Sequence, residues 1–257
     1  MRNIKILFNK MPEFNILEDA GLPQVKKREG ITRVITPEIK EKAEKLGFDF
    51  YDGDRKYGYG GYYYDGRWKA VAKTIKERYN LDKNSKVLID RCHKGFLVFD
   101  LKELIPGITV YGIHPGEYAL IHAIEGYGKW ALINRTEKGE PEFIEEKAKQ
   151  AVIPYLLKAE STEMPFNDGF FDVIISIENA CSYSLEECKK VVREIIRVSK
   201  NNGKNCYIQN DSWRNENEKQ KLLEWTYLCK TFLDINDWEK LYQEEGYNGD
   251  WGYTIIT

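Results

Sequence analysis

From residue 86 onward, short apolar strands alternate with single amphipathic helices along the sequence. The expected strands are residues 86–90, 108–113, 154–160, 170–177, 204–210 and 251–257. Strands that are separated by single helices predict a parallel sheet with helices on both faces. The fold class is therefore α/β, with a doubly wound and mostly parallel sheet.

Ligands of such sheets bind beyond the carboxyl ends of the strands, at the point where the strand order reverses. The residues to inspect are those that directly follow the expected strands, namely 90–95, 114–117, 160–163, 178–183 and 210–213. We expect these side chains to line one crevice that takes a small-molecule substrate.

The composition restricts the classes of function. The 257 residues are 42% hydrophobic and 31% charged, which suits one large domain with a buried core. With 39 basic and 41 acidic residues, the chain lacks the positive excess of a nucleic-acid-binding surface. It has no apolar run of the roughly 18 residues that a membrane span needs, and no convincing signal peptide. Five scattered cysteines without a CxxC pair indicate a reducing compartment, so we expect a cytoplasmic protein.

Residues 50–68 form a tract that is rich in tyrosine and glycine and has no helical period. The tract lies between two expected helices, residues 37–48 and 68–80, and predicts a structured loop. A loop of this kind is suited to close over the crevice and exclude water. It is equally suited to pack against a second subunit in a homo- or hetero-oligomer.

The domain organisation follows from these segments. We divide the chain into an N-terminal arm, residues 1–55, and an α/β domain, residues 56–257. The charged stretch of residues 126–150 has the character of an insertion into that domain, with a helix expected from Pro141.

Residues 86–97, KVLIDRCHKGFL, have the outline of a strand, a sharp turn and the start of a helix. Arg91, His93 and Lys94 lie in the turn, where backbone N–H groups, the helix dipole and cationic side chains suit a phosphate group. The alternative is that Arg91 pairs with an acid and His93 fills the pocket. His114 follows the neighbouring strand, so the two histidines are expected in the same crevice. The spacing of possible ligands matches no compact metal motif, and we predict no bound metal.

Four segments together resemble the class I S-adenosylmethionine-dependent methyltransferases, and the likeness covers residues 56–257. They are KVLIDRCHKGF (86–96), VYGIHPGEYAL (110–120), AESTEMPFNDGFFDVIIS (159–176) and FLDINDWEKLYQEEGY (232–247). The resemblance implies a Rossmann-like fold and S-adenosylmethionine as the cofactor. The aromatic tract YGYGGYYYDGRWK resembles the arm that precedes the core in some small-molecule methyltransferases.

The cofactor motif is degenerate in this chain. In the register of the resemblance, the acid of the first motif falls on Ile89 and its first two glycines fall on Arg91 and His93. Only the third glycine is present, as Gly95. The acid that holds the ribose hydroxyls falls on His114, and one imidazole offers at most one acceptor to them.

The resemblance also implies roles for individual residues. The cofactor-binding candidates are Tyr59, Cys92, Gly95, His114, Glu160 and Ser161, and the catalytic candidates are Glu178, as general base, and His93. The implied function is methyl transfer to a small polar metabolite, such as a sugar or a cell-surface glycan precursor. Two alternatives stay open. One is a non-catalytic, methyltransferase-like subunit that stabilises an active partner. The other is an enzyme of this fold that binds a phosphorylated ligand through Arg91, His93 and Lys94.

Overall fold

The computed structural model describes residues 13–22 and 34–257. The helices of the described residues are α1 (Ile16–Asp19), α2 (Pro37–Glu44), α3 (Phe48–Tyr51), α4 (Trp68–Tyr79), α5 (Phe96–Leu104), α6 (Glu117–Ile121), α7 (Tyr127–Ile133), α8 (Pro141–Val152), α9 (Leu185–Val198), α10 (Glu216–Trp225) and α11 (Ile235–Glu244). Two 3-10 turns, Ile153–Tyr155 and Ala180–Ser182, accompany them. The strands are β1 (Lys86–Asp90), β2 (Thr109–His114), β3 (Leu156–Lys158), β4 (Val173–Ile177), β5 (Cys206–Ser212) and β6 (Asp250–Ile255).

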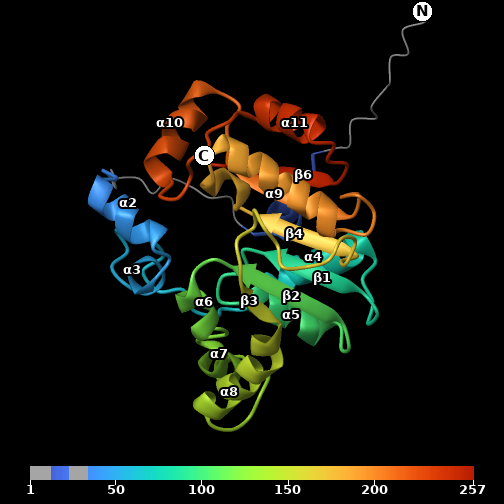
Figure 1. The fold of residues 1–257 in the computed structure, drawn as a ribbon. Helices are drawn as coiled ribbons and strands as arrows, with labels where there is room; N and C mark the ends of the chain where they lie inside the picture. Colours follow the sequence, from blue (N-terminus) through green and yellow to red (C-terminus); the bar gives the residue numbers. More distant parts are fainter. Residues whose placement is uncertain (1–12, 23–33) are drawn as a thin grey trace, which may run out of the picture.

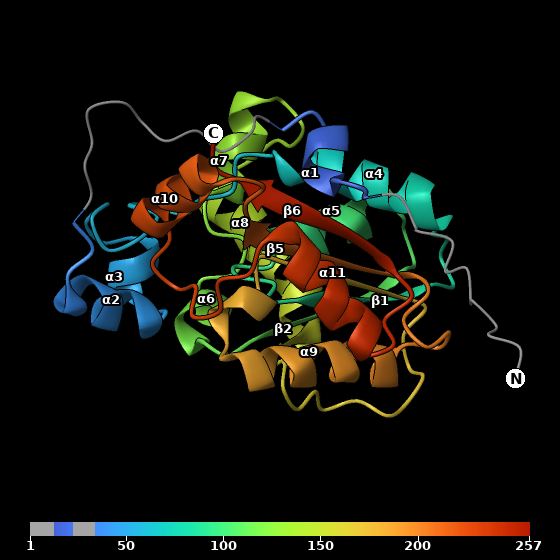
Figure 2. The same cartoon turned by 90° about the horizontal axis from the view of Figure 1, so that it is seen from above.

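The six strands form one sheet in the order β3-β2-β1-β4-β5-β6, and every pair of neighbours in it is parallel (Figure 1). This confirms the predicted α/β class, because the order reverses between β1 and β4 as it does in a doubly wound sheet. Seen from above, α1, α4 and α5 cover one face of the sheet and α9 and α11 cover the other (Figure 2). The reversal point places the ends of β1 and β4 side by side.

Several boundaries differ from the sequence-based expectation. Helix α6 ends at Ile121, and the left-handed backbone angles of Ile124 and Gly126 separate it from α7. The third strand is reduced to Leu156–Lys158 at the sheet edge. The N-terminal arm contributes a helix that the sequence did not indicate, α1, which Asn15 caps by accepting from the backbone of residues 17 and 18. Ile16 of this helix is fully buried in the main core.

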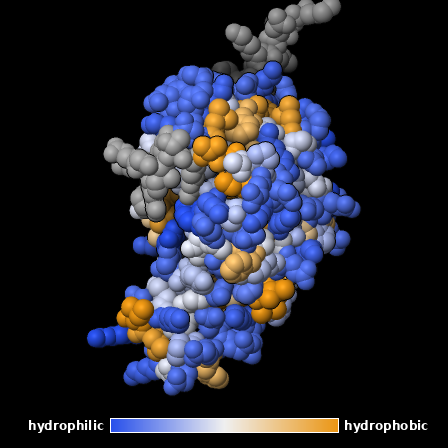
Figure 3. All heavy atoms as spheres, turned by 90° about the vertical axis from the view of Figure 1, so that its left-hand side faces the viewer, coloured by the Kyte–Doolittle hydropathy of each residue, from blue (hydrophilic) through white to orange (hydrophobic). Residues whose placement is uncertain are grey.

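The charged stretch of residues 126–150 folds mainly as two helices, α7 and α8, at the lower end of the molecule (Figure 1). Ile133 and Phe143 of this pair are 79% and 73% exposed. Apolar residues accordingly appear on the lower part of the face shown in Figure 3. None of the helices in the described part of the chain has both the length and the apolar character that a membrane span requires.

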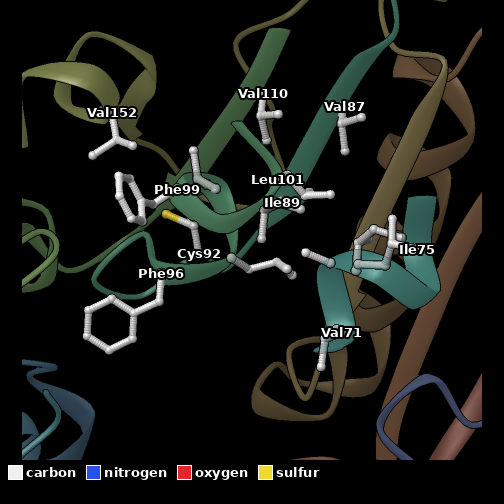
Figure 4. Packing of buried hydrophobic residues seen from close by; sticks show 14 of the residues in the cluster. Val71, Ile75, Val87, Ile89, Cys92, Phe96, Phe99, Leu101, Val110 and Val152 are labelled. Atoms are coloured by element: carbon white, nitrogen blue, oxygen red, sulfur yellow. The ribbon is translucent and has the colours of Figure 1, made fainter. Parts of the chain in front are cut away.

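Two hydrophobic cores enclose the sheet, and side-chain alternation along the strands supplies both. In β1, Val87 and Ile89 face the core with α4 and α5, whereas Leu88 faces the core with α9 and α11. Figure 4 shows the first core, in which the strand residues meet Val71 and Ile75 of α4. Ile89 and Asp90, the last two residues of β1, therefore point to opposite faces of the sheet.

Candidate functional site

The turn after β1 has left-handed backbone angles, which glycine adopts most easily, although Arg91 and His93 stand where the resemblance implies glycines. Arg91 has φ 57° and His93 has φ 50°, and Gly95 has φ 73°. A left-handed conformation costs a non-glycine residue about 1–2 kcal/mol. Glu178, which follows β4, shares it with φ 54°. Strain of this kind persists only where the surroundings enforce it, and it clusters at functional sites.

The three strained residues Arg91, His93 and Glu178 line one pocket at the reversal point of the sheet. Its other walls come from the aromatic tract, from β1 and from β4, through residues such as Tyr59, Tyr62, Trp68, Ile89, Cys92 and Ile177. The space in which the centre of a water-sized sphere fits is about 60 Å³. A few water molecules fill such a volume.

Tyr51, from the end of α3, bridges the two histidines of the site. Its hydroxyl lies 2.7 Å from His93 Nδ1 and 3.0 Å from His114 Nε2, and its ring is fully buried. The hydroxyl can donate its single proton to one imidazole and accept from the other when the facing nitrogen of that second ring carries a proton. The two histidines lie close together, with ring centres 5.3 Å apart, but His93 lines the pocket and His114 does not. Sequence reasoning did not find Tyr51, because nothing local in FDFYDG indicates its long-range partners.

Both imidazoles are neutral near pH 7. Burial lowers the pKa of His114 to about 4, with a further contribution from the Arg91 charge. Burial likewise lowers the pKa of His93, and His114 and Arg91 add to the shift. Neither histidine therefore supplies a positive charge for a phosphate group.

Lys94 is also unavailable to a ligand, because its buried ammonium group is committed to two carboxylates. Nζ lies 2.9 and 2.8 Å from the two oxygens of Asp52 and 2.6 Å from Glu125 Oε2. Tyr118 donates to the same Asp52 carboxylate at 2.8 Å. The network ties the aromatic tract to the first turn of the α/β domain. It leaves Arg91 as the single cation of the predicted phosphate site, so the geometry does not support that alternative.

Asp90 is the centre of a second buried network, on the other side of the turn. Its oxygens accept from Ser161 at 2.5 Å, from Ser176 at 2.8 Å and from the Asn179 amide at 2.6 Å. Burial raises the pKa of Asp90, and these three hydrogen bonds oppose the rise. Arg91 extends the network by donating to Asn179 Oδ1 at 3.2 Å. The sequence interpretation named Ser161 as cofactor-binding and included Asn179 in the range 178–183, but it missed Ser176.

The other residues singled out in the sequence are divided between the pocket and its surroundings. Tyr59, Cys92, His93 and Glu178 line the pocket, and burial raises the pKa of the Cys92 thiol. Gly95 begins α5, and the space beside its Cα is taken by Leu156, 3.2 Å from where a Cβ would stand. Glu160 is exposed and accepts from the Tyr183 hydroxyl at 2.9 Å.

Glu178 is the acidic group of the pocket. Its Oε1 accepts from the Thr254 hydroxyl at 2.9 Å, and its N–H donates to the Gln209 carbonyl at 2.7 Å. Burial raises the pKa of Glu178, while Thr254 and Arg91 oppose the rise. A partly buried carboxyl group with a raised pKa is a reasonable proton acceptor for a bound substrate.

Comparison with known proteins supports a methyltransferase relationship. Residues 92–207, a little under half of the chain, match the family model described as "Methyltransferase domain". This confirms the resemblance to class I methyltransferases seen in the sequence, and it supports S-adenosylmethionine-dependent methyl transfer as the chemistry of the family. No curated protein matches the chain by sequence.

Solved structures give weaker likenesses. One is the complex of the Haloferax volcanii Trm112 methyltransferase activator with a putative methyltransferase, at 14% identity and TM-score 0.48, covering 83% of this chain and 77% of that one. The YcgJ protein of Bacillus subtilis is 12% identical with TM-score 0.43, over 68% of this chain and 66% of that one. A putative methyltransferase of Bacillus halodurans is 17% identical with TM-score 0.46, over 68% of both chains. Because the identities are below 25% and the TM-scores below 0.5, we draw no conclusion about function from these structures.

The family typically uses S-adenosylmethionine, but the residues of this site do not fit it in the present conformation. Ile89 stands where the resemblance places an acid, and Arg91 and His93 stand where it places glycines. The Tyr51 hydroxyl takes the hydrogen bond that His114 would offer a ribose. The free space is also far too small for a nucleoside. Binding of this cofactor therefore requires the aromatic tract to move.

Proposed function

We propose that this protein transfers a methyl group from S-adenosylmethionine to a small polar acceptor that binds in the pocket between the ends of β1 and β4. The observation that carries the proposal is the match of residues 92–207 to the methyltransferase domain, because this range contains part of the pocket lining, including His93 and Glu178. The strained Arg91, His93 and Glu178 support it, because they gather at the switch point where ligands of such sheets bind.

The chain's own groups have distinct tasks in this proposal. Methyl transfer needs the acceptor to be held in line and, for a hydroxyl or amine, a base that takes its proton. Glu178 is the acid of the pocket that can take that proton. Arg91 is held by Asn179 beside it and offers a donor to an acceptor that carries oxygen atoms. Tyr59, Tyr62 and Trp68 cover the pocket and exclude water. The mixture of polar and aromatic walls suits the chemistry of a sugar or glycan precursor, and such an acceptor, like the cofactor, enters once the aromatic tract has moved.

A second candidate function is a methyltransferase-like subunit that binds no cofactor and stabilises a partner. The specific observation in its favour is the bridge from Tyr51 to His93 and His114, which fills the site with the chain's own groups. The exposed Ile133 and Phe143 of the α7–α8 pair offer a surface for the partner.

Calorimetric titration with S-adenosylmethionine and S-adenosylhomocysteine separates the two. The wild-type protein is compared with Tyr51→Ala, which removes the bridge, and with Tyr63→Ala, a matched control whose ring is 52% exposed. Methyl transfer predicts binding by the wild type or, if the bridge blocks the site, tighter binding by Tyr51→Ala than by Tyr63→Ala. If none of the three proteins binds either compound, the methyltransferase proposal is wrong and the second candidate remains.

A further inference from the structure

Beyond the pocket, a second cluster of reactive side chains lies at the same edge of the sheet. Cys181 follows β4 in the 3-10 turn, Asp211 lies near the end of β5, and Cys229 lies in the loop after α10. Their two sulfur atoms and a carboxylate oxygen all lie within 4.8 Å of one another. Both cysteines are buried, and Asp211 is partly exposed.

Main-chain hydrogen bonds hold this cluster together across the fold. The N–H groups of Lys230 and Thr231 donate to the Cys181 carbonyl at 2.8 and 3.0 Å, so the loop that carries Cys229 is fixed beside the turn. The Cys181 N–H donates to Asn210 Oδ1 at 3.1 Å, which joins the turn to the strand that carries Asp211. The three side chains are thus positioned by the backbone of three separate segments. Their sequence spacing follows no compact motif, which is why the sequence did not indicate them.

The composition of the cluster suits a cation. Two thiol sulfur atoms and a carboxylate oxygen lie close enough together to reach one metal ion. Within residues 13–22 and 34–257, no side chain donates a hydrogen bond or forms an ion pair with the Asp211 carboxylate, so its oxygen atoms can bind an ion.

We propose that Cys181, Asp211 and Cys229 bind one zinc ion. Thiolate sulfur and carboxylate oxygen are both zinc ligands, and the sulfur-containing set excludes magnesium and calcium. Three protein ligands leave one position of a tetrahedral ion open, as in catalytic zinc sites. The three residues lie at the ligand-binding edge of the sheet, after β4, near the end of β5 and in the loop after α10. Zinc binding releases the thiol protons and therefore weakens as the pH falls. The inference is independent of methyl transfer.

Metal analysis of the purified full chain tests the site. Protein stripped with a chelator is titrated with Zn²⁺, and separately with Co²⁺, whose absorption reports thiolate ligation. We expect one equivalent of either ion and a sulfur-to-cobalt charge-transfer band for the wild type. Cys181→Ser, Cys229→Ser and Asp211→Asn should each weaken Zn²⁺ binding by about tenfold or more. Cys206→Ser is the control, since this buried thiol lies at the opposite end of β5.

Three outcomes overturn the proposal. The first is wild-type protein that binds no metal. The second is metal binding that the three ligand variants leave unchanged, which would place the ion elsewhere. The third is a wild type in which Cys181 and Cys229 form a disulfide in air and reduction does not restore metal binding. Circular dichroism checks that each variant is folded. The cobalt spectrum of the wild-type protein tests thiolate ligation by itself, even if a variant fails to fold.

Discussion

The buried ammonium group of Lys94 gives the sharpest test of how the aromatic tract is attached. The side chain of Lys94 is fully buried, and those of Asp52 and Glu125 are 5% and 29% exposed. Lys94→Met keeps a side chain of similar length but removes the charge, which leaves two carboxylates facing each other in a largely buried site. Removing one partner of a buried ion pair costs about 3–5 kcal/mol. We expect the free energy of unfolding at pH 7 to fall by about this amount.

Urea unfolding followed by circular dichroism measures the loss, and Lys158→Met is the matched control. Lys158 pairs with Glu117 at 3.1 Å, but these side chains are 60% and 65% exposed. An exposed pair contributes about 0–1 kcal/mol, so the control should stay close to the wild type. Both variants remove one positive charge, so the difference between their losses in the free energy of unfolding measures the effect of burial.

The pH dependence of the Lys94→Met effect has a definite sign. Burial by itself raises the pKa of Asp52, but hydrogen bonds from Lys94, Tyr62 and Tyr118 outweigh it, and the net pKa lies below its ordinary value. The pair therefore stabilises the fold above the unfolded-state pKa of about 4 and loses that contribution as the pH falls through the folded-state pKa. The difference between wild type and variant should narrow in acid. A loss below about 1 kcal/mol at pH 7, or a difference that does not narrow, would refute the reasoning.

Three further predictions concern the networks around the turn. Tyr51→Phe should lower the free energy of unfolding by about 1–3 kcal/mol, because two buried imidazoles lose their shared partner; Tyr63→Phe should change it by less than about 0.5 kcal/mol in the same urea series. The pKa of His114 is lowered to about 4, so the unfolded chain takes up its proton first as the pH falls and the wild type loses stability below about pH 6.5. His114→Asn should show about 2 kcal/mol less loss between pH 7 and pH 5, and equal pH profiles would contradict the neutral buried imidazole. Asp90→Asn should cost about 1–3 kcal/mol, since its new amide group faces three donors; an unchanged urea midpoint would show that this network contributes nothing.

The sheet and its main helices could be predicted from the sequence because their signals are local. The apolar run VIISI predicts β4, and the apolar periodicity of residues 185–200 predicts α9. A capping box of Ser184 and Glu187 marks the start of that helix. The parallel pairing follows from the helices that separate each strand from the next.

The candidate site was less predictable because long-range contacts define it. Asp90 meets Ser161 and Asn179 across 71 and 89 positions of sequence. One local signal was present and went unused: Ser176 is a polar residue inside an otherwise apolar strand, and such a residue must find a buried partner. No comparable signal marks Tyr51 among the many aromatic residues around it.

The turn after β1 is held in place by its own side-chain contacts, although Arg91 and His93 stand where the resemblance implies glycines. A turn that merely lost its glycines would relax away from left-handed angles or leave buried polar atoms without partners. Arg91 and His93 keep those angles, and both are held by hydrogen bonds, to Asn179 and to Tyr51. His114, at the other altered position, is held by the same tyrosine. The two histidines thus share one partner in the aromatic tract, whereas Arg91 has its partner in Asn179. This arrangement predicts that restoring glycine at Arg91 or His93 alone, without removing Tyr51, will not by itself open the site to a nucleoside.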